Sequence, residues 1–342
     1  MYAETQQTGR MSARARPDGL DELVVRYGVP LLILDPNAAR ERYRELQAAF
    51  PFLRLHYDAS ALAHPTVISA IAECDGYFEV SEEGALAALQ ASHVDPARAM
   101  HTHPVKHPQD LLAAYNAGVR IFVVDSQPEV EKFIGYPDDV RIVLRVRFPS
   151  AHQLQVPAVV HGVTIDEAPG VVRFASSLGV RIHGFSLLLS GDRRGAQPYA
   201  AAISRTLGLM VELEETLRYR FDVLDLGPDF PTADHSTAVE RAEIARAVRT
   251  LLLPLANRLT ILAEPGRSVA ARCLTLVTNT VQVGVEPHVA SESIDAGASL
   301  VVADSRHEET ASLFTMLADT RHRIFHPAHP EKRAAQTRAA AG

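Results

Sequence analysis

The sequence predicts an α/β protein: a (β/α)8 TIM barrel with a small, truncated β domain built from both ends of the chain. Short apolar runs alternate with amphipathic helical patterns, and eight such units fit into about 220 residues. No G-x-G-x-x-G follows any of these runs, which argues against a Rossmann fold. The eight barrel strands are expected at 54–58, 76–81, 99–104, 121–126, 141–148, 182–189, 221–227 and 259–266.

Helical patterns fill the connections between these runs. HPTVISAIAEC and HPQDLLAAYNAG begin with His-Pro, and the second ends at a glycine, as helix termini commonly do. Strand-like runs also lie outside the barrel, VPLLILD before it and SLVVADS after it. We therefore expect a flexible leader over 1–26, the barrel over 37–270, the small β domain over 27–36 plus 271–326, and a disordered tail over 327–342.

Composition excludes several classes of partner. The net charge is −7 and there is no basic stripe, so we expect no nucleic-acid binding. No apolar run reaches the roughly 18 residues that span a bilayer, and the N-terminus has no apolar signal region. We expect a cytoplasmic protein without a membrane partner. Cys74 and Cys273 lie in apolar contexts typical of buried free thiols.

Five motifs occur in a characteristic order: YDASAL, FEVSEEGAL, HTHPVKHPQDLLAAYNAG, LDLGPDFP and AEPGR. This order resembles the pyridoxal-phosphate (PLP) enzymes of the alanine racemase fold (fold type III), specifically their ornithine/diaminopimelate decarboxylase branch. The resemblance covers about residues 28 to 326. It implies a cofactor at the C-terminal mouth of the barrel, where sites of this architecture lie in any case. It also implies a homodimer that assembles head to tail.

Three residues match the cofactor site of that family. The resemblance places Glu264 against the pyridine nitrogen and Arg267 beside the phosphate, and Arg145 matches the arginine of the family's VLR strand. Their functional interpretation is a pocket for a small anionic or amino-acid-like ligand, with a buried carboxylate available as acid or base. The alternative is an ion-pair network that only stabilises the barrel.

The most informative departure from the family is Ser60. The family's Schiff-base lysine lies in a Y-A-V-K segment, and YDAS aligns with it so that Ser60 takes the place of the lysine. Serine has no amine and cannot form an aldimine. The other lysines, Lys106, Lys132 and Lys332, do not lie at that position. We therefore expect no covalent PLP.

Further departures concern the phosphate and the ring of the cofactor. The family's G-G-G-F-P loop reads here Gly227, Pro228, Asp229, Phe230, Pro231, so that proline removes a donor and aspartate adds a negative charge. Gly227 and Asp229, with Arg267, would form a degenerate phosphate site. The histidine that stacks on the ring is replaced by Leu188, and the C-terminal C-D-G motif is expected only after residue 326.

Polar residues on the first and third strands suggest a second kind of site. His56, Asp58 and Ser60 alternate along the first strand and point to one side, as do His101 and His103 on the third. One hypothesis is a metal site, or a haem ligated by a histidine, built from His101 or His103 with His56 and Asp58. The alternative is a hydrogen-bonded inner layer without a metal.

Three functions remain open at this stage. The first is a biosynthetic enzyme of PLP-independent chemistry and lyase-like ancestry, acting on an amino-acid-like anion, with Glu264, Arg145, Asp58 and Ser60 as its catalytic residues. The second is a non-catalytic regulatory partner of the antizyme-inhibitor type, a homodimer or a heterodimer with an active paralogue. The third is a residual PLP-dependent amino-acid decarboxylase.

Overall fold

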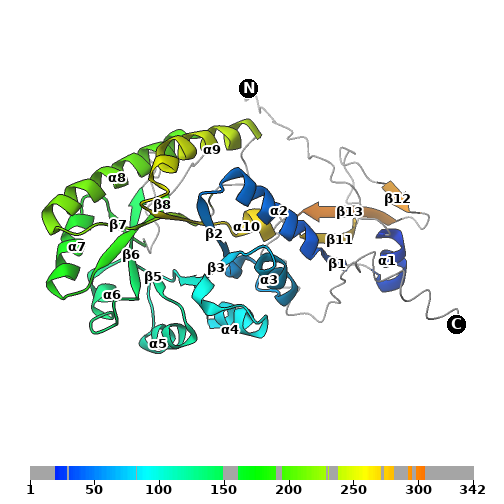
Figure 1. Cartoon of the computed structure of the whole chain (residues 1–342). Helices are drawn as coiled ribbons and strands as arrows, with labels where there is room; N and C mark the ends of the chain where they lie inside the picture. Colours follow the sequence, from blue (N-terminus) through cyan, green and yellow to red (C-terminus); the bar gives the residue numbers. More distant parts are fainter. Residues whose placement is uncertain are drawn as a thin grey trace, which may run out of the picture.

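The computed structural model describes residues 20–28, 31–81, 83–148, 161–189, 195–228, 230, 238–270, 273–280, 292–294 and 298–304. A closed barrel of eight parallel strands forms its centre (Figure 1). The barrel strands are β2 (Leu53–Asp58), β3 (Tyr77–Val80), β4 (Ala99–His101), β5 (Ile121–Val124), β6 (Arg141–Phe148), β8 (Ile182–Leu189), β9 (Val223–Pro228) and β10 (Thr260–Glu264). They run in the order β5-β4-β3-β2-β10-β9-β8-β6, and pairing between β5 and β6 closes the ring. The predicted TIM barrel is confirmed.

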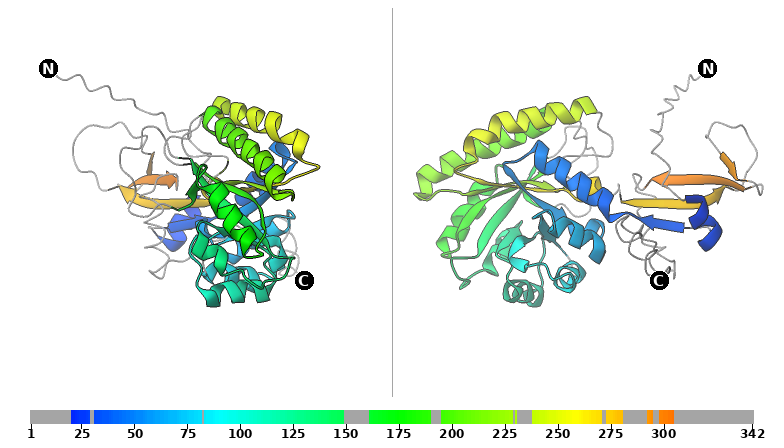
Figure 2. Two further views of the ribbon diagram at one scale, coloured as in Figure 1. Left: turned by 90° about the vertical axis from the view of Figure 1, so that its left-hand side faces the viewer. Right: turned by 45° about the vertical axis from the view of Figure 1, so that its right-hand side comes forward.

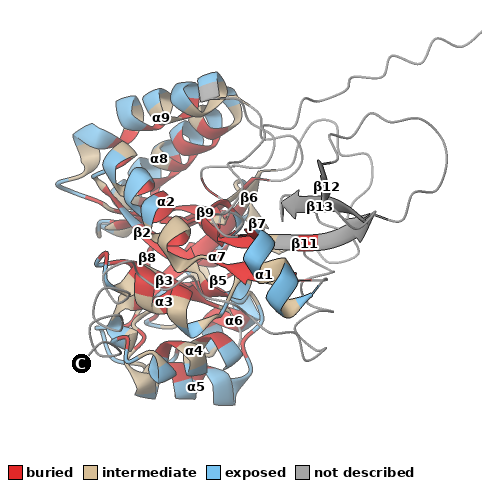
Figure 3. Ribbon diagram, turned by 90° about the vertical axis from the view of Figure 1, so that its right-hand side faces the viewer, coloured by how far each residue is buried: buried red, intermediate tan, exposed pale blue. Residues whose placement is uncertain are grey.

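Helices follow the strands and cover the outside of the barrel, with exposed outer faces over buried strands (Figure 3). They are α2 (Pro36–Ala49), α3 (Pro65–Ala72), α4 (Glu83–Ala91), α5 (Pro108–Ala117), α6 (Gln127–Glu131), α7 (Ala168–Ser177), α8 (Gln197–Leu217), α9 (Ala238–Leu252) and α10 (Arg267–Ala270). Short 3-10 turns are η1 (Ala59–Ala61), η2 (Pro96–Arg98) and η3 (Leu253–Leu255). Sequence signals explain the helix starts: Asp35 caps α2 by accepting from the Asn37 N–H, and proline occupies the first turn.

The two faces of the barrel strands have different chemistry. Side chains on the outer face, among them Tyr57, Phe78 and Phe122, belong to the main core under the helices. On the inner face, a small separate apolar cluster is formed by Met100, Val123, Val143, Val223 and Leu262. Because side chains alternate along a strand, the next inward positions on β6 and β9 are Arg145 and Asp225. The polar residues of the barrel therefore gather at the C-terminal mouth.

A second, antiparallel sheet lies beside the barrel (Figure 2). Its strands are β1 (Leu31–Leu34), β11 (Leu274–Thr280), β13 (Ala298–Asp304) and β12 (Glu292–Ile294), in that order. The chain thus contributes to this sheet from both sides of the barrel, as predicted. Helix α1 (Leu20–Tyr27) packs on it through Leu20, which is 1% exposed.

Some predicted boundaries differ from the structure or lie beyond what it describes. The segment 1–26, expected as a flexible leader, contains most of α1, whose amphipathic pattern buries Leu20 against β1. The expected tail, 327–342, lies outside the described residues. A two-residue strand, β7 (Val163–Thr164), adds to β6 and was not predicted. Among the described helices, none combines the length and apolarity needed to cross a membrane.

Candidate functional site

Arg145 and Glu264 meet inside the barrel mouth. Arg145 comes from β6 and Glu264 from the end of β10, and an Arg145 Nη2 to Glu264 Oε1 distance of 3.3 Å makes them an ion pair. Both are buried, at 6% and 3% exposure. The other terminal nitrogen of Arg145 donates to the Thr102 carbonyl at 3.5 Å. The structure therefore brings together two residues that the sequence assigned to one site.

Glu264 also faces a second carboxyl group. Asp225, which is fully buried on β9, forms a hydrogen bond with Glu264 and accepts another from the Ser186 hydroxyl at 2.6 Å. Burial raises the pKa of Glu264 well above its ordinary value; the charge of Asp225 adds to this, and Arg145 opposes it. Two carboxyl groups that share a hydrogen bond hold one proton between them.

A second carboxyl pair lies at the ends of β2 and β3. Asp58 and Glu79 stand opposite each other in the parallel register of these strands and share a hydrogen bond. The Thr102 hydroxyl also donates to Glu79, which is 2% exposed. Burial raises the pKa of Glu79 well above its ordinary value, and the Asp58 charge adds to the effect.

Ser60 is not inside the barrel. Strand β2 ends at Asp58, and the Asp58 carboxylate caps η1 by accepting from the Ser60 N–H at 2.9 Å. The Ser60 hydroxyl donates to the same oxygen, Asp58 Oδ1, at 2.5 Å, and the residue is exposed. A Cβ on Gly266 would lie 2.9 Å from the Asp58 side chain, so glycine lets the AEPGR loop approach it closely. Ser60 thus lies at the rim, joined to the acidic pair.

Glu79 and Thr102 are site residues that sequence analysis missed. Both point into the barrel and lie next to residues that were predicted. The alternation of side chains along the FEVS and AMHT segments is the sequence signal that could have identified them. The signal was weak because the inward positions of these short strands mix polar and apolar residues, and on β4 the outward positions do so as well. Only the register across β2, β3 and β4 decides which of their side chains meet.

The predicted phosphate site is only partly described. Gly227 has a positive φ of 82°, and a Cβ there would lie 1.8 Å from the Leu187 carbonyl oxygen, so only glycine fits. Its N–H donates to Asp225 Oδ1 at 3.0 Å. Asp229 lies outside the described residues, and Arg267 is exposed at the start of α10. The Gly227 amide of the expected phosphate loop therefore already has a carboxylate acceptor.

The three histidines predicted as metal ligands do not converge. His56 faces the barrel interior on the same side of β2 as Asp58. His101 lies on the outer side of β4, stacked on Phe122 with ring centroids 6.0 Å apart, because Met100 takes the inward position. His103 is exposed beyond the strand, with its Nδ1 at 2.6 Å from the Val105 carbonyl. Among the described residues, no group of three histidine, cysteine or acidic side chains could hold a metal ion.

Burial makes the two enclosed histidines weak bases. It lowers the pKa of His56 to about 4 and that of His101 to about 3, with Lys106 adding to the effect on His101. Both rings are therefore neutral near pH 7.

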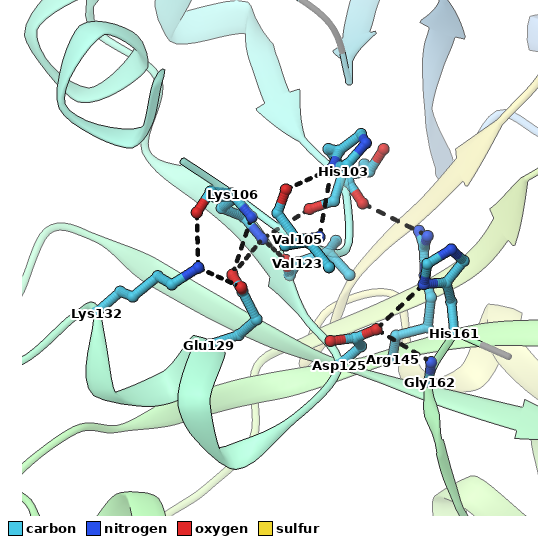
Figure 4. A network of polar contacts seen from close by, with 11 residues as sticks. His103, Val105, Lys106, Val123, Asp125, Glu129, Lys132, Arg145, His161 and Gly162 are labelled. Carbon is cyan, nitrogen blue, oxygen red and sulfur yellow. Dashed lines mark hydrogen bonds and ion pairs between the residues drawn. The ribbon is translucent and has the colours of Figure 1, made fainter. Parts of the chain in front are cut away.

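A separate network of charges lies beside the mouth (Figure 4). The Lys106 ammonium donates to the carbonyls of His103, at 2.8 Å, and Val123, and its nitrogen is 3.7 Å from Glu129 Oε2. Lys132 donates to the Lys106 carbonyl at 2.6 Å and to Glu129. Burial lowers the pKa of Lys106 to about 8, although Glu129 opposes the change. Both described lysines are thus engaged with backbone carbonyls and one carboxylate.

Residues 37–271 match the model of the pyridoxal-dependent decarboxylase family, over its pyridoxal binding domain. The chain belongs to this family. Antizyme inhibitor 2 of Xenopus laevis is 23% identical over 298 residues, with 86% of this chain and 63% of that protein covered. Ornithine decarboxylase of Caenorhabditis elegans is 23% identical over 258 residues, covering 75% of this chain and 61% of the enzyme.

Among solved structures, the lysine/ornithine decarboxylase of Vibrio vulnificus, complexed with putrescine, has a similar fold. Its TM-score is 0.68 at 27% identity, with 77% of this chain and 71% of that one covered. The chain thus spans little more than 60% of the length of the curated relatives.

Family membership corrects one prediction from the sequence. A PLP-independent enzyme of lyase-like ancestry was expected, because the resemblance places Ser60 where the family has its anchoring lysine. That expectation is wrong, since the matching family is pyridoxal-dependent and its relatives include ornithine decarboxylases. The residue at one position says nothing about ancestry, which is carried by the fold and the remaining motifs.

Proposed function

We propose that this chain is a non-catalytic member of the pyridoxal-dependent decarboxylase family, a binding protein of the antizyme-inhibitor type. It holds no PLP as a Schiff base. The observation that carries the proposal is Ser60, whose hydroxyl donates to Asp58 at the end of β2, where the family resemblance places the lysine. A hydroxyl has no nitrogen with which to form an imine.

The surrounding residues support the same conclusion. The Gly227 amide donates to Asp225, and Pro228 has no N–H, which leaves few backbone donors for a phosphate dianion. Lys106 is held by two carbonyls and Glu129, and Lys132 by one carbonyl and Glu129. The residues described at this mouth therefore do not fit a covalently held PLP.

Resemblance to antizyme inhibitor 2 suggests how a non-catalytic chain would act. That relative is named for its effect on another protein. By analogy, we propose that this chain works by pairing with a chain of the same fold, either a second copy or an active paralogue. An amino-acid-like small molecule is the ligand we propose for the mouth.

In the deciding experiment, the full chain is incubated with excess PLP and treated with borohydride. The mass of the protein is then measured. We expect no covalent pyridoxyl adduct. Ser60→Lys is the matched variant, because it restores an amine at one position and alters nothing else. An adduct on the wild-type protein in stoichiometric yield would overturn the proposal, and peptide mapping would identify the lysine.

A second candidate is residual PLP-dependent decarboxylation, favoured by family membership and by the retained Arg145–Glu264 pair. It requires Lys106 to leave its carbonyl partners and reach the cofactor. A pyridoxyl group mapped to Lys106 would support this candidate.

A further inference from the structure

Among the described residues, acidic side chains outnumber basic ones inside the mouth. Four carboxyl groups point into it, from Asp58, Glu79, Asp225 and Glu264, and among the described residues Arg145 is the one guanidinium that meets them. Arg145 is committed to Glu264 and to the Thr102 carbonyl. The Asp58–Glu79 pair therefore has hydroxyl partners and a shared proton, but no bonded cation within the described part of the chain.

A buried histidine adds an independent acceptor to this interior. His56 is 1% exposed, and its Nδ1 lies 3.0 Å from the Phe78 carbonyl, so Nδ1 must carry the proton. In a neutral ring the lone pair is then on Nε2, which has no partner among the described residues. His56 lies on the same face of β2 as Asp58, and the charge of Asp225 acts on its ring, so it faces the acidic interior.

We infer that the Asp58–Glu79 pair, with Ser60, is a non-covalent binding site for the primary ammonium group of a small ligand. An ammonium group has three N–H donors and no acceptor, which matches a site that offers carboxylate and hydroxyl oxygens. Entry is from the rim, because Ser60 is exposed and Asp58 is half-buried, whereas Glu79 and His56 are enclosed. The inference rests on the proposed function, because an aldehyde cofactor anchored at this point would take the same space.

A metal ion fits this site less well than an organic cation. A divalent ion needs three or more ligands converging on one point, and the described residues contain no such group. When the ammonium binds, the proton shared by Asp58 and Glu79 leaves for solvent. An ammonium held by two carboxylates then replaces a singly charged carboxyl pair, and the net charge of the site is unchanged. The ligand's amine supplies a positive charge that the described residues do not place against Asp58 and Glu79.

Calorimetric titration of the full chain with n-butylammonium chloride, without any aldehyde, tests this site. We expect saturable one-to-one binding and no binding of 1-butanol, which has the same chain but no charge. The binding enthalpy should vary with the ionisation enthalpy of the buffer, as release of a proton requires. Equal binding of both compounds, or of neither, would overturn the inference.

Two variants locate the site. Glu79→Gln should weaken butylammonium binding at least tenfold, whereas Glu215→Gln, on the exposed face of α8, should leave it unchanged. Ser60→Lys places an ammonium of the protein's own at the rim and should abolish binding, which keeps the test valid if Glu79→Gln does not fold. Unchanged binding by Ser60→Lys contradicts the inference. The titration contains no aldehyde. Its outcome is therefore independent of the borohydride labelling experiment, which tests the proposed function.

Discussion

The two buried charge clusters of this barrel differ in how completely they are balanced. In the cluster of Lys106, Glu129 and Lys132, two ammonium groups share one carboxylate and donate to backbone carbonyls. In the described part of the mouth, two carboxyl pairs surround one guanidinium. The lysine cluster satisfies its own hydrogen bonds. The carboxyl groups of the mouth, in contrast, lie close together only because each pair shares a proton.

This difference separates a structural role from a functional one. A fully paired buried network fixes the position of the elements that carry it, here the segment after β4 and helix α6. An unbalanced one is costly to fold and persists where a ligand uses it. Variants that remove charge should therefore have opposite effects on stability in the two clusters.

The largest effect is expected from Lys106→Met. Removing this ammonium leaves the buried Glu129 with Lys132 alone and takes a donor from the buried Val123 carbonyl and the partly buried His103 carbonyl, so the free energy of unfolding should fall by about 4 kcal/mol. Lys132→Met is the matched control, since its side chain is 26% exposed, and should cost only about 1 kcal/mol. Urea unfolding at pH 7 measures both. Equal losses for the two lysines would contradict the view that Lys106 holds this network together.

A smaller effect, specific to pH, is expected from His56. Its pKa is about 4 in the folded chain against 6.5 for the free side chain, so the unfolded state binds the proton more readily. The stability that comes from keeping His56 neutral is present above pH 6.5 and is lost as the pH falls through 4, for a total of about 3 kcal/mol. His56→Gln should remove this part of the pH profile. Parallel profiles for wild type and variant between pH 7 and 4 would show that the ring is not buried as described.

The barrel could be predicted from the sequence because its strands are separate apolar runs with helix signals between them. Predicted and observed strands coincide for β6 and β8, and those elsewhere shift only at their ends. The direction of His101 could not be predicted, because Ala99 and Met100 are both apolar and alternation alone does not tell which faces inward. Ser60 was expected on the first strand with His56 and Asp58, but that strand ends at Asp58, whose side chain caps η1. Local hydrogen bonding decided both where β2 ends and the exposure of Ser60 after it.

The smallest effect is expected from Glu79→Gln and has the opposite sign, because removing this carboxyl group should stabilise the fold. The pKa of Glu79 is raised by burial, so the native state holds a proton that the unfolded chain releases; this stability is present below the unfolded pKa of 4.5 and is lost as the pH rises through the raised value. Glu79→Gln replaces the shared proton by an amide donor that does not titrate. The variant should be more stable than wild type by about 1 kcal/mol at pH 8, and the gain should shrink toward pH 5. Thermal unfolding at the two pH values measures it. A loss of stability at pH 8 would mean that Glu79 is charged and paired there, in which case the mouth is as well balanced as the lysine cluster.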